Sequence, residues 1–457
     1  MRAPIFPLLV FGFVASACTG AVRPPGTSDP IETVATRLAI PLDTRSEATA
    51  PSISSVRGIS RREALQIAFR ENPEIAQHTA ALGLAEADYR AAATLSNPVA
   101  GMATRLPADG VGVLSLEFDL MGDVLQLLQR KDRMEASGLK VEEAIFSISD
   151  ALLDFATRVD KAYFDLQAAQ HRHRLLVALA EATAAEASRS EALVNRELLD
   201  RTTALRHRIL ATQADLDARR AALEVAVART MWARMLARAD DDSLPLPIPE
   251  LPPLPATPSQ LASPGALAME HRLDLMAARK AIDARGVEHR IALDWRWWSV
   301  LEIGTMGERD SDGQLVMGPA INIALPIFDQ GSASLMRTAS ELRRAQQRTA
   351  TLALDIQQSA NAAYARTQAL HDLARRQRDD GLPLQSSLVD MLEKQVALGF
   401  SSQFALQQAR RDHLQATSVY VDALRDYWLA EAVLRRAVGG VAEAGLVSLD
   451  PLAGRER

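Results

Sequence analysis

The chain has 457 residues, 24% of them charged, a net charge of −6 and no basic patch, which argues against nucleic acid as a partner. Its single cysteine, Cys18, excludes intramolecular disulfides and cysteine-based metal sites. Beyond the N-terminal segment, no stretch is apolar for long enough to form a transmembrane helix, so a membrane would have to be crossed by strands.

The N-terminus has the pattern of a secretory signal. Arg2 is followed by an apolar run and by small residues up to position 17, which predicts a signal peptide over 1–17. The sequence V-A-S-A-C ending at Cys18 resembles a bacterial lipobox, in which the cysteine is acylated, although Ala15 stands where leucine is usual. The alternative is a signal peptide cut elsewhere, with loss of Cys18. Thr19 follows rather than an aspartate, which favours the outer membrane.

The rest of the chain reads as two copies of one unit. Helix-reversing turns are predicted at 193–195 and 397–399, where Asn195 and Gly399 are 204 residues apart (399 − 195). Asn and Gly are the residues that tolerate the left-handed conformation such turns need. The predicted segments are a lipidated tether over 18–57, repeat 1 over 58–243, a proline-rich linker over 244–262, repeat 2 over 263–440 and a loose tail over 441–457.

Each repeat contains a predicted β-hairpin with period-two alternation. One hairpin of this kind would fit an amphipathic hairpin on a soluble core, but two favour membrane strands with lipid on one side and water on the other. The predicted strands are 98–106, 111–121, 295–307 and 317–328. The predicted lipid-facing residues are Leu114, Leu116, Phe118, Leu120, Ile321, Ile323, Leu325 and Ile327.

Three tryptophans, Trp295, Trp297 and Trp298, gather where the second hairpin is predicted to start. They suit an aromatic belt at a membrane interface, and a set of core tryptophans is the alternative.

Long helical patterns fill the remainder of each repeat. The last of them carries alanine every seventh residue from Ala409 to Ala437, a heptad seam that allows close approach of a partner helix. Ser60 and Glu63 predict a capping box, and breaks are expected near Asn72 and near 273–275. Gly381 and Pro383 predict a kink. The predicted helices are 60–95, 123–194, 197–238, 329–398 and 400–438.

Motifs of catalysis and of cofactor binding are missing from the sequence. It has no nucleotide loop, HExxH, GxSxG or CxxC, so neither an enzyme, a cofactor nor a resident metal is expected. His207 and His413 fall on the helix seams and are interpreted as packed or water-facing neutral histidines.

Several motifs together resemble the TolC-like outer-membrane factors, in particular the lipoprotein branch with the CusC-like and CzcC-like exit ducts. They are ISRREALQIAFRENPEI, EHRLDLMAARKAI, LPIFDQG, and ALGFSS followed by LQQARR. The resemblance implies a mainly α fold with a membrane β-barrel part, and a homotrimer that forms a twelve-stranded barrel and an α-helical periplasmic tunnel. It also implies a periplasmic adaptor and an inner-membrane pump of the resistance-nodulation-division type as partners.

The resemblance also assigns roles to the helix turns. The adaptor-docking tips would be Leu193, Val194, Asn195, Ala397, Leu398 and Gly399, and the tunnel-mouth positions would be Val396, Ser401, Ala405 and Gln408. Family members often have an aromatic residue three positions before the tip glycine and acidic residues six and nine after it. Val396, Ala405 and Gln408 depart from that pattern, which argues against charge-based gating or cation capture at this aperture.

The sequence therefore predicts an outer-membrane, lipid-anchored exit duct for small molecules or metal ions, in contact with outer-membrane lipid. Two alternatives stay open: the outer-membrane component of type I protein secretion, and a periplasmic coiled-coil scaffold lipoprotein without a pore. The cargo is not encoded in any motif of the chain.

Overall fold

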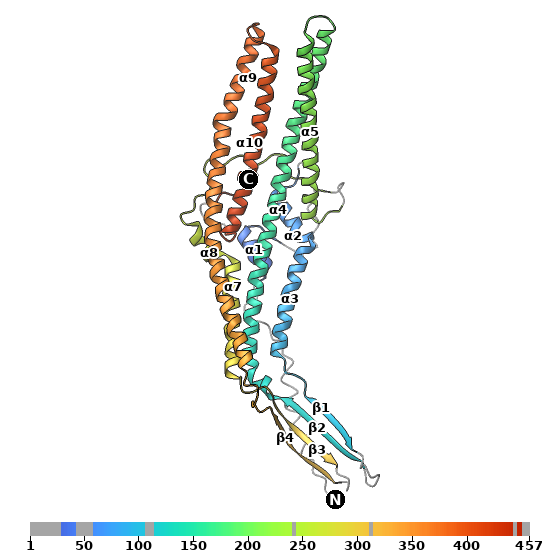
Figure 1. Cartoon of the computed structure of the whole chain (residues 1–457), viewed down its shortest axis with the longest axis vertical. Helices are drawn as coiled ribbons and strands as arrows, with labels where there is room; N and C mark the ends of the chain where they lie inside the picture. The colour runs from blue at the N-terminus through green and yellow to red at the C-terminus, as the bar shows by residue number, and fades with distance from the viewer. Residues whose placement is uncertain are drawn as a thin grey trace. The chain divides into compact units, whose positions relative to one another are not determined.

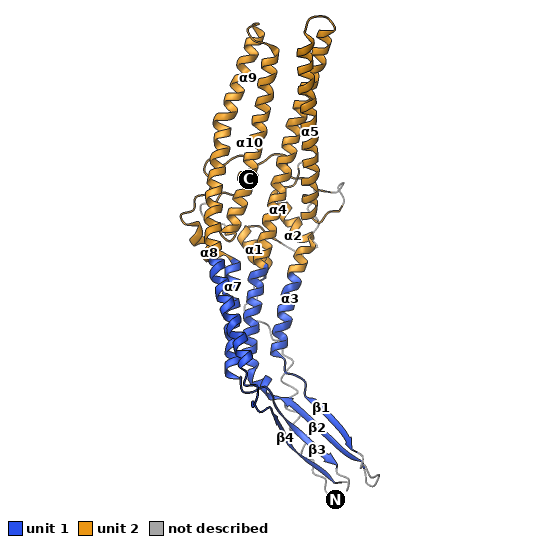
Figure 2. Cartoon of the chain, in the orientation of Figure 1, with its two compact units in different colours: residues 1–29, 79–148, 273–353 blue, residues 30–78, 149–272, 354–457 orange. Residues whose placement is uncertain are grey.

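The computed structural model describes residues 29–42, 58–105, 114–239, 244–309, 314–441 and 446–449. The predicted signal peptide, Cys18 and most of the predicted tether lie outside these residues. The described chain divides into two compact units (Figure 2). Of the described residues, Asp29 and those within 79–148 and 273–353 form unit 1, and those within 30–78, 149–272 and 354–449 form unit 2.

Unit 1 contains one antiparallel sheet whose strands lie in the order β1-β2-β3-β4 (Figure 1). The strands are β1 (Val99–Arg105), β2 (Ser115–Asp123), β3 (Leu301–Arg309) and β4 (Leu315–Ile323). All four predicted strands are present, with shifted ends.

The two largest errors in the strand boundaries fall in the second hairpin. β3 begins at Leu301 rather than 295, because the Trp295 N–H still donates to the Ile291 carbonyl at 3.1 Å and so extends the preceding helix. β4 ends at Ile323 rather than 328, and Pro326, which has no N–H to donate to a ladder, follows three residues later.

The helical part of unit 1 is held by charged pairs between helices. It includes α7 (Leu273–Asp294) and the first parts of α4 (Val124–Val194) and α8 (Ser332–Arg376). Ion pairs join α7 to α4: Lys280–Glu142 at 2.6 Å, Arg290–Glu135 at 2.7 Å and Lys140–Glu288 at 2.6 Å. A small apolar cluster of Tyr89, Val141 and Ile145 packs α3 (Pro73–Ala93) on α4.

Unit 2 consists mainly of two helical hairpins that run side by side in Figure 1. One joins α4 to α5 (Arg201–Met235), and the other joins α9 (Leu382–Ala397) to α10 (Gln403–Ala437). Its core is aromatic: Phe164 stacks on Trp428 with ring centroids 6.1 Å apart, and Trp232 and Tyr427 are also fully buried.

The predicted kink in the second repeat takes the form of a π-helical turn, Gln377–Gly381, between α8 and α9. Pro383 lies in the first turn of α9, where its missing N–H interrupts the regular hydrogen-bond ladder. Such single turns are a recognised cause of helix irregularity.

The predicted helix start and helix breaks are present. Ser60 and Glu63 cap each other at the start of α2 (Arg61–Glu71), and Asn72 separates α2 from α3. In repeat 2 the break falls at Arg272, one residue ahead of the predicted 273–275, between α6 (Pro264–His271) and α7.

Part of the predicted tether is folded, which corrects the expectation of an extended chain over 18–57. Helix α1 (Pro30–Leu38) buries Ile31 and Val34, which lie one turn apart on one face. Arg37 then donates to the carbonyls of His271 and Gly439, which lie at the C-terminal ends of α6 and α10. A cation near the C-terminal end of a helix is favourable, so the segment docks in spite of its polar composition.

The proline-rich linker is bound to the helices of unit 2 along its length. The indole N–H of Trp232 donates to the Pro245 carbonyl at 2.8 Å, and that of Trp428 to the Pro252 carbonyl at 2.9 Å. Prolines suit this role because they leave backbone carbonyls exposed and keep the chain extended.

The tail was predicted to be loose, but its residues 446–449 are packed. Val447 donates its N–H to the Ser259 hydroxyl at 2.9 Å and accepts from Arg435 at 2.9 Å, and Leu449 is buried. Ser259 also donates to the buried carboxyl of Glu431, so linker, tail and α10 share one polar cluster.

Within the described residues, no helix is both long and apolar enough to cross a membrane.

Candidate functional site

The strand register separates the sheet into an apolar and an acidic face. Cross-strand partners share a face, and Phe118 lies opposite Met102 on β1 and Gly307 on β3. Following the partners across the sheet gives one mainly apolar face, which also holds Thr104, Thr305 and, opposite Leu116, Arg309. Its apolar residues include Met102, Leu116, Phe118, Leu120, Ile303, Met317, Ile321 and Ile323. Leu116, Phe118, Leu120, Ile321 and Ile323 were all predicted to lie on one face, and the register places them together.

The opposite face carries carboxylates from β2 and β3. Two pairs stand directly across from each other, Glu117 with Glu308 and Asp123 with Glu302, and Asp119 lies between them. Like charges in direct opposition are destabilising unless water solvates them. Only Glu117 has an ionic partner on this face in the described chain, Arg105 at 2.7 Å, so this face requires an aqueous environment.

Leu114, Leu325, Ile327 and the three tryptophans lie outside the strands, which corrects their predicted placement. Leu114 immediately precedes β2. Leu325 and Ile327 follow β4 in an irregular segment and are 73% and 67% exposed. The tryptophans occupy the turn between α7 and β3.

The segment after β4 runs beside the segment before β3. Ala324 donates its N–H to the Val300 carbonyl at 3.3 Å, and Gly331 lies against the Arg296 backbone. The Arg296 guanidinium covers the Trp297 ring at 4.3 Å. Exposed apolar and aromatic side chains from the two segments therefore gather at the end of the sheet, outside its ladder.

The two helix-reversing turns share one backbone geometry. In the first, the N–H groups of Glu197 and Leu198 donate to the carbonyls of Val194 and Leu193; in the second, Gly399 and Phe400 donate to Val396 and Gln395. This is the Schellman pattern, in which the first of the two donors has positive φ. Glu197 has φ 61° and Gly399 has φ 76°.

The structure corrects the predicted equivalence of Asn195 and Gly399. The residue equivalent to Gly399 is Glu197, so the true spacing of the repeats here is 202 (399 − 197). Two ion pairs obey the same spacing. Glu191 pairs with Arg208 within the first hairpin at 3.6 Å, and Glu393 pairs with Arg410 within the second hairpin at 2.6 Å. Asn195 looked equivalent only because Asn is the commoner left-handed residue.

Each turn presents an apolar residue to solvent. Leu198 is 70% exposed and Phe400 is 81% exposed, at equivalent positions of the two turns, and Leu398 beside Phe400 is 69% exposed. Asp200 then caps α5 and Ser402 caps α10 through their side-chain oxygens. Leu198 and Phe400 were not among the predicted tip residues, although their position after the reversing residue was visible in the sequence.

The predicted mouth positions lie at the start of α10 and the end of α9. Val396, Ser401, Ala405 and Gln408 are all half-buried. The Gln408 amide donates to both carboxylate oxygens of Asp412, at 3.0 and 3.1 Å. The acidic group that was expected at position 408 is therefore present one helical turn later, at Asp412. Residues four positions apart on a helix are neighbours, so this contact could have been found in the sequence.

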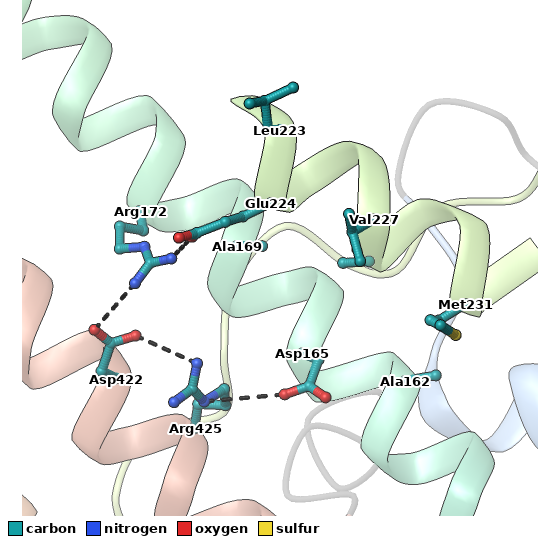
Figure 3. A pocket seen from close by; sticks show the side chains of 11 residues that line it. Ala162, Asp165, Ala169, Arg172, Leu223, Glu224, Val227, Met231, Asp422 and Arg425 are labelled. Carbon is teal, nitrogen blue, oxygen red and sulfur yellow. Dashed lines mark hydrogen bonds and ion pairs between the residues drawn. The ribbon is translucent and has the colours of Figure 1, made fainter. Parts of the chain in front are cut away.

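The boundary between the two hairpins carries charged groups, and we call this boundary the hairpin seam (Figure 3). Arg172 of α4 contacts Glu224 of α5 and, at 3.5 Å, Asp422 of α10. Arg425 of α10 contacts Asp422 at 3.5 Å and Asp165 of α4 at 3.9 Å. These residues line a cavity of about 520 Å³.

Burial raises the pKa of the Asp165 carboxyl above its usual range, although Arg425 and Lys161 oppose the shift. Burial lowers the pKa of the Arg425 guanidinium, but the nearby carboxylates of Asp426 and Asp422 outweigh this effect, so the pKa is raised overall. Ionic contacts between α4 and α10 include Arg436–Asp150 at 2.7 Å, Arg172–Asp422 at 3.5 Å and Arg425–Asp165 at 3.9 Å, and the last of these is the longest.

Nearer the turns, a ring stack crosses the hairpin seam. His207 of α5 stacks on Phe404 of α10 with centroids 5.6 Å apart and planes 12° from parallel, and its Nδ1 contacts the Ser190 hydroxyl of α4. Of the two interpretations of His207, packed or water-facing, its exposure of 6% supports the packed one.

Solved structures match this chain over nearly its whole length. The CmeC outer membrane channel of Campylobacter jejuni superposes with a TM-score of 0.71 at 12% identity, covering 96% of this chain and 97% of that one. The open state of the Neisseria gonorrhoeae MtrE outer membrane channel gives 0.69 at 16% identity, covering 93% and 100%. The chain has the fold of a bacterial outer-membrane channel.

The match confirms the TolC-like resemblance at the level of the fold. CusC, a member of the predicted branch, is among the matched structures, with a TM-score of 0.66 at 15% identity over 91% of this chain and 99% of that one. No family model and no curated protein matches the sequence.

The residues of the hairpin seam were missed by sequence reasoning. Arg172 meets Glu224 and Asp422, which are 52 and 250 positions away (224 − 172 and 422 − 172). Charges on long helices usually mark solvated faces, and no periodicity connects positions so far apart.

Proposed function

We propose that this chain is the outer-membrane exit duct of a tripartite efflux system, through which small molecules or metal ions pass without chemical change. The observation that carries the proposal is the sheet, with one apolar and one acidic face, on a chain with the fold of outer-membrane channels. A strand that faces lipid on one side and water on the other has this alternation.

The duct would be a homotrimer. In the described sheet, β1 and β4 each have one unpaired edge, and open edges within lipid leave backbone groups without partners. Four strands are too few to close a membrane barrel, for which about eight are the minimum. Three copies would supply twelve strands, the number that the TolC-like resemblance implies.

The helices support the same assembly. Helix α5 has a second apolar stripe, on the side away from its own hairpin core, with Ile209, Leu216 and Leu223 at seven-residue spacing and at least 48% exposed. A neighbouring copy would cover this stripe and complete an α-helical periplasmic tunnel, since a heptad stripe fits a partner helix.

The proposed location is the bacterial outer membrane. Leu116, Phe118, Ile321 and Ile323 would face lipid, and acylated Cys18 would add an anchor. Leu114, Leu325, Ile327 and the belt of Trp295, Trp297 and Trp298 would meet the membrane interface from segments outside the strands, because aromatic rings favour this region.

The turns would dock a periplasmic adaptor, with an inner-membrane pump of the resistance-nodulation-division type behind it. Leu198, Leu398 and Phe400 would be the apolar contacts, beside the predicted tip residues 193–195 and 397–399. Exposed apolar side chains at the ends of two hairpins are the kind of surface that a partner covers.

Reconstitution tests the proposal directly. The purified full-length protein should elute in detergent as a trimer and conduct ions in a planar lipid bilayer, and it should need detergent for extraction from membranes. Release by salt alone, with no conductance, would support the scaffold alternative instead. In cells, Cys18→Ser should abolish acyl labelling while leaving the protein in the membrane, because the sheet supplies its own apolar band.

A further inference from the structure

Glu431 of α10 is a fully buried acid with no cation in direct contact among the described residues. Its side chain is 0% exposed, and one carboxyl oxygen, Oε1, accepts from the Ser259 hydroxyl. The other oxygen, Oε2, is buried and makes no hydrogen bond within the described chain. Arg435, one helical turn later, donates to the Val447 carbonyl at 2.9 Å instead. The carboxyl group therefore lies in an enclosed polar site without an ionic partner.

An enclosed site of this kind favours the neutral form of the acid. Taking an ionised carboxylate out of water is costly unless a cation or several hydrogen bonds compensate for the lost hydration. Burial raises the pKa of Glu431, and the hydrogen bond from Ser259 and the charge of Arg435 oppose this shift only in part. Ionisation is therefore easier once water reaches the carboxyl group.

The same carboxyl group fixes the hydroxyl that holds the tail. The Ser259 hydroxyl donates its single proton to Glu431, and its oxygen accepts the Val447 N–H at 2.9 Å. The Ser259 carbonyl accepts from the Gln368 amide of α8 at 2.6 Å. Ser259 is 0% exposed and Leu449 is 3% exposed, so these bonds are closed off from water. Residues 446–449 are thus linked to α10 through one buried acid.

Other titratable and charged groups surround this acid. Tyr427 and Arg435 lie one turn before and one turn after it on α10, and a buried Arg61–Asp160 ion pair at 2.7 Å stands near Arg435. The ring of His371 on α8 meets the Tyr427 ring edge-on, with centroids 5.5 Å apart. Burial raises the pKa of the Tyr427 hydroxyl, and guanidinium groups keep their charge. Histidine is the side chain here that also titrates near neutral pH, so the experiment must separate it from the acid.

We propose that Glu431 is a proton-dependent latch for the tail: the neutral acid holds Ser259 and, through it, residues 446–449 on α10, and loss of the proton releases them. Ionisation does not remove the acceptor of the Ser259 hydroxyl. It makes the enclosed site costly relative to a hydrated one, and the short tail is the segment that gives way to water. The inference goes beyond the duct function and does not rest on it, because it concerns packing within unit 2.

The sign of the pH dependence follows from the raised pKa. A carboxyl group whose pKa in the folded protein lies above its ordinary value of 4.5 stabilises the packed state fully below pH 4.5. This contribution is lost as the pH rises from there through the raised pKa. The tail should therefore be held in acid and released in alkali.

Amide hydrogen exchange of the full-length protein in detergent measures the latch. Mass spectrometry follows the peptide that contains Val447 between about pH 4 and pH 9, with correction for the intrinsic exchange rate. Protection should be level in acid and then fall by up to about tenfold per pH unit until the raised pKa of Glu431 is passed, as expected for one proton. In Glu431→Gln, which keeps an oxygen for Ser259 and carries no charge at any pH, protection should stay level throughout.

Asp165→Asn is the matched control. Asp165 is a half-buried acid of unit 2 whose pKa is also raised by burial, but it contacts Arg425 and not the tail. This variant should keep the pH dependence of the parent protein. Protection that does not change with pH in the parent protein would overturn the latch. A fall that persists in Glu431→Gln would also overturn it and would point to His371.

Ser259→Ala provides a second test that leaves the acid in place. It removes the hydroxyl between Glu431 and Val447, so protection of the tail should be low and independent of pH. Gel filtration must show that each variant assembles like the parent protein. If Glu431→Gln fails to assemble, Ser259→Ala decides, because a pH-dependent fall in that variant would equally overturn the latch.

Discussion

The two hairpin turns of unit 2 reach the same geometry with different residues. Both use the Schellman pattern, both carry an exposed apolar residue next to the reversing residue, and both are flanked by an ion pair across the hairpin. The reversing residue, however, is Glu197 in one and Gly399 in the other. Glu at positive φ costs about 1–2 kcal/mol relative to Gly. The two turns therefore have the same hydrogen-bond geometry although their residues differ.

The largest effect should come from the sheet, where both repeats contribute to one apolar face. Phe118→Arg in repeat 1 and Ile321→Arg in repeat 2 should each destabilise the inserted protein by about 2–4 kcal/mol, since a cation at the middle of the bilayer is costly. Ala320→Arg, one position away on the acidic face, should cost much less. The measurement is the amount of assembled oligomer; equal losses from Ile321→Arg and Ala320→Arg would refute the assigned faces.

At the second turn, Gly399→Val should cost about 1–2 kcal/mol through the backbone alone, because no atom lies within 4 Å of a Cβ at this position. Leu398 and Phe400 would be displaced with it. We expect an assembled, membrane-inserted protein that no longer cross-links to its adaptor, whereas Gly399→Asn should be mild. Unimpaired cross-linking of Gly399→Val would remove this turn from the docking surface.

The opposite substitution tests the first turn. Glu197→Gly should stabilise the hairpin by roughly 0.5–1 kcal/mol, the relief of a strained φ less the entropy that glycine loses on folding. Amide exchange at Leu198, whose N–H closes the turn, should slow in the variant. Faster exchange would show that the Glu197 side chain stabilises the turn by more than its positive φ destabilises it.

The ion pairs that flank the turns should contribute less. Double-mutant cycles on Glu393–Arg410 and Glu191–Arg208 should give coupling energies of about 0.2–1 kcal/mol, with the shorter Glu393–Arg410 contact the larger. Thermal unfolding of the four variants of each pair measures this. A larger coupling at Glu191–Arg208 would reverse the ranking made from distance.

The smallest expected effect concerns the N-cap residues of α5 and α10, and it appears only at acidic pH. Hydrogen bonds from the Thr202 and Thr203 hydroxyls hold the pKa of Asp200 well below its usual value of 3.8, while Ser402 at the other turn carries no charge. A lowered pKa in the folded state means that the cap stabilises α5 above the unfolded pKa and loses this contribution as the pH falls. Protection of the Thr202 and Thr203 amides should therefore decline below about pH 4, and that of Ala405 should not. Equal decline at both caps would contradict the assignment.

Local signals in the sequence predicted some parts of the site. Alternation located Leu116, Phe118 and Ile321 on one face, because a period of two fixes the side of a strand without reference to its neighbours. Strand ends were harder to predict: Trp295 lies in the turn that closes α7, and Leu325 lies beyond the end of β4, and hydrophobicity alone signals neither event. The residue with positive φ was predicted two positions too early, at Asn195 rather than Glu197, because Asn adopts the left-handed conformation more readily than Glu.

By itself, the sequence determined the duplicated plan of this protein, the four strands, the heptad helices and the capping box. Each depends on spacing within a few turns or pleats, where covalent geometry fixes which side chains share a face. Only the tertiary structure decided that the linker, α1 and the tail are bound to the helices, and that Arg172, Asp165 and Asp422 meet at the hairpin seam. Those contacts join residues tens to hundreds of positions apart, and they form because packing brings together backbone carbonyls and charges that no local period relates.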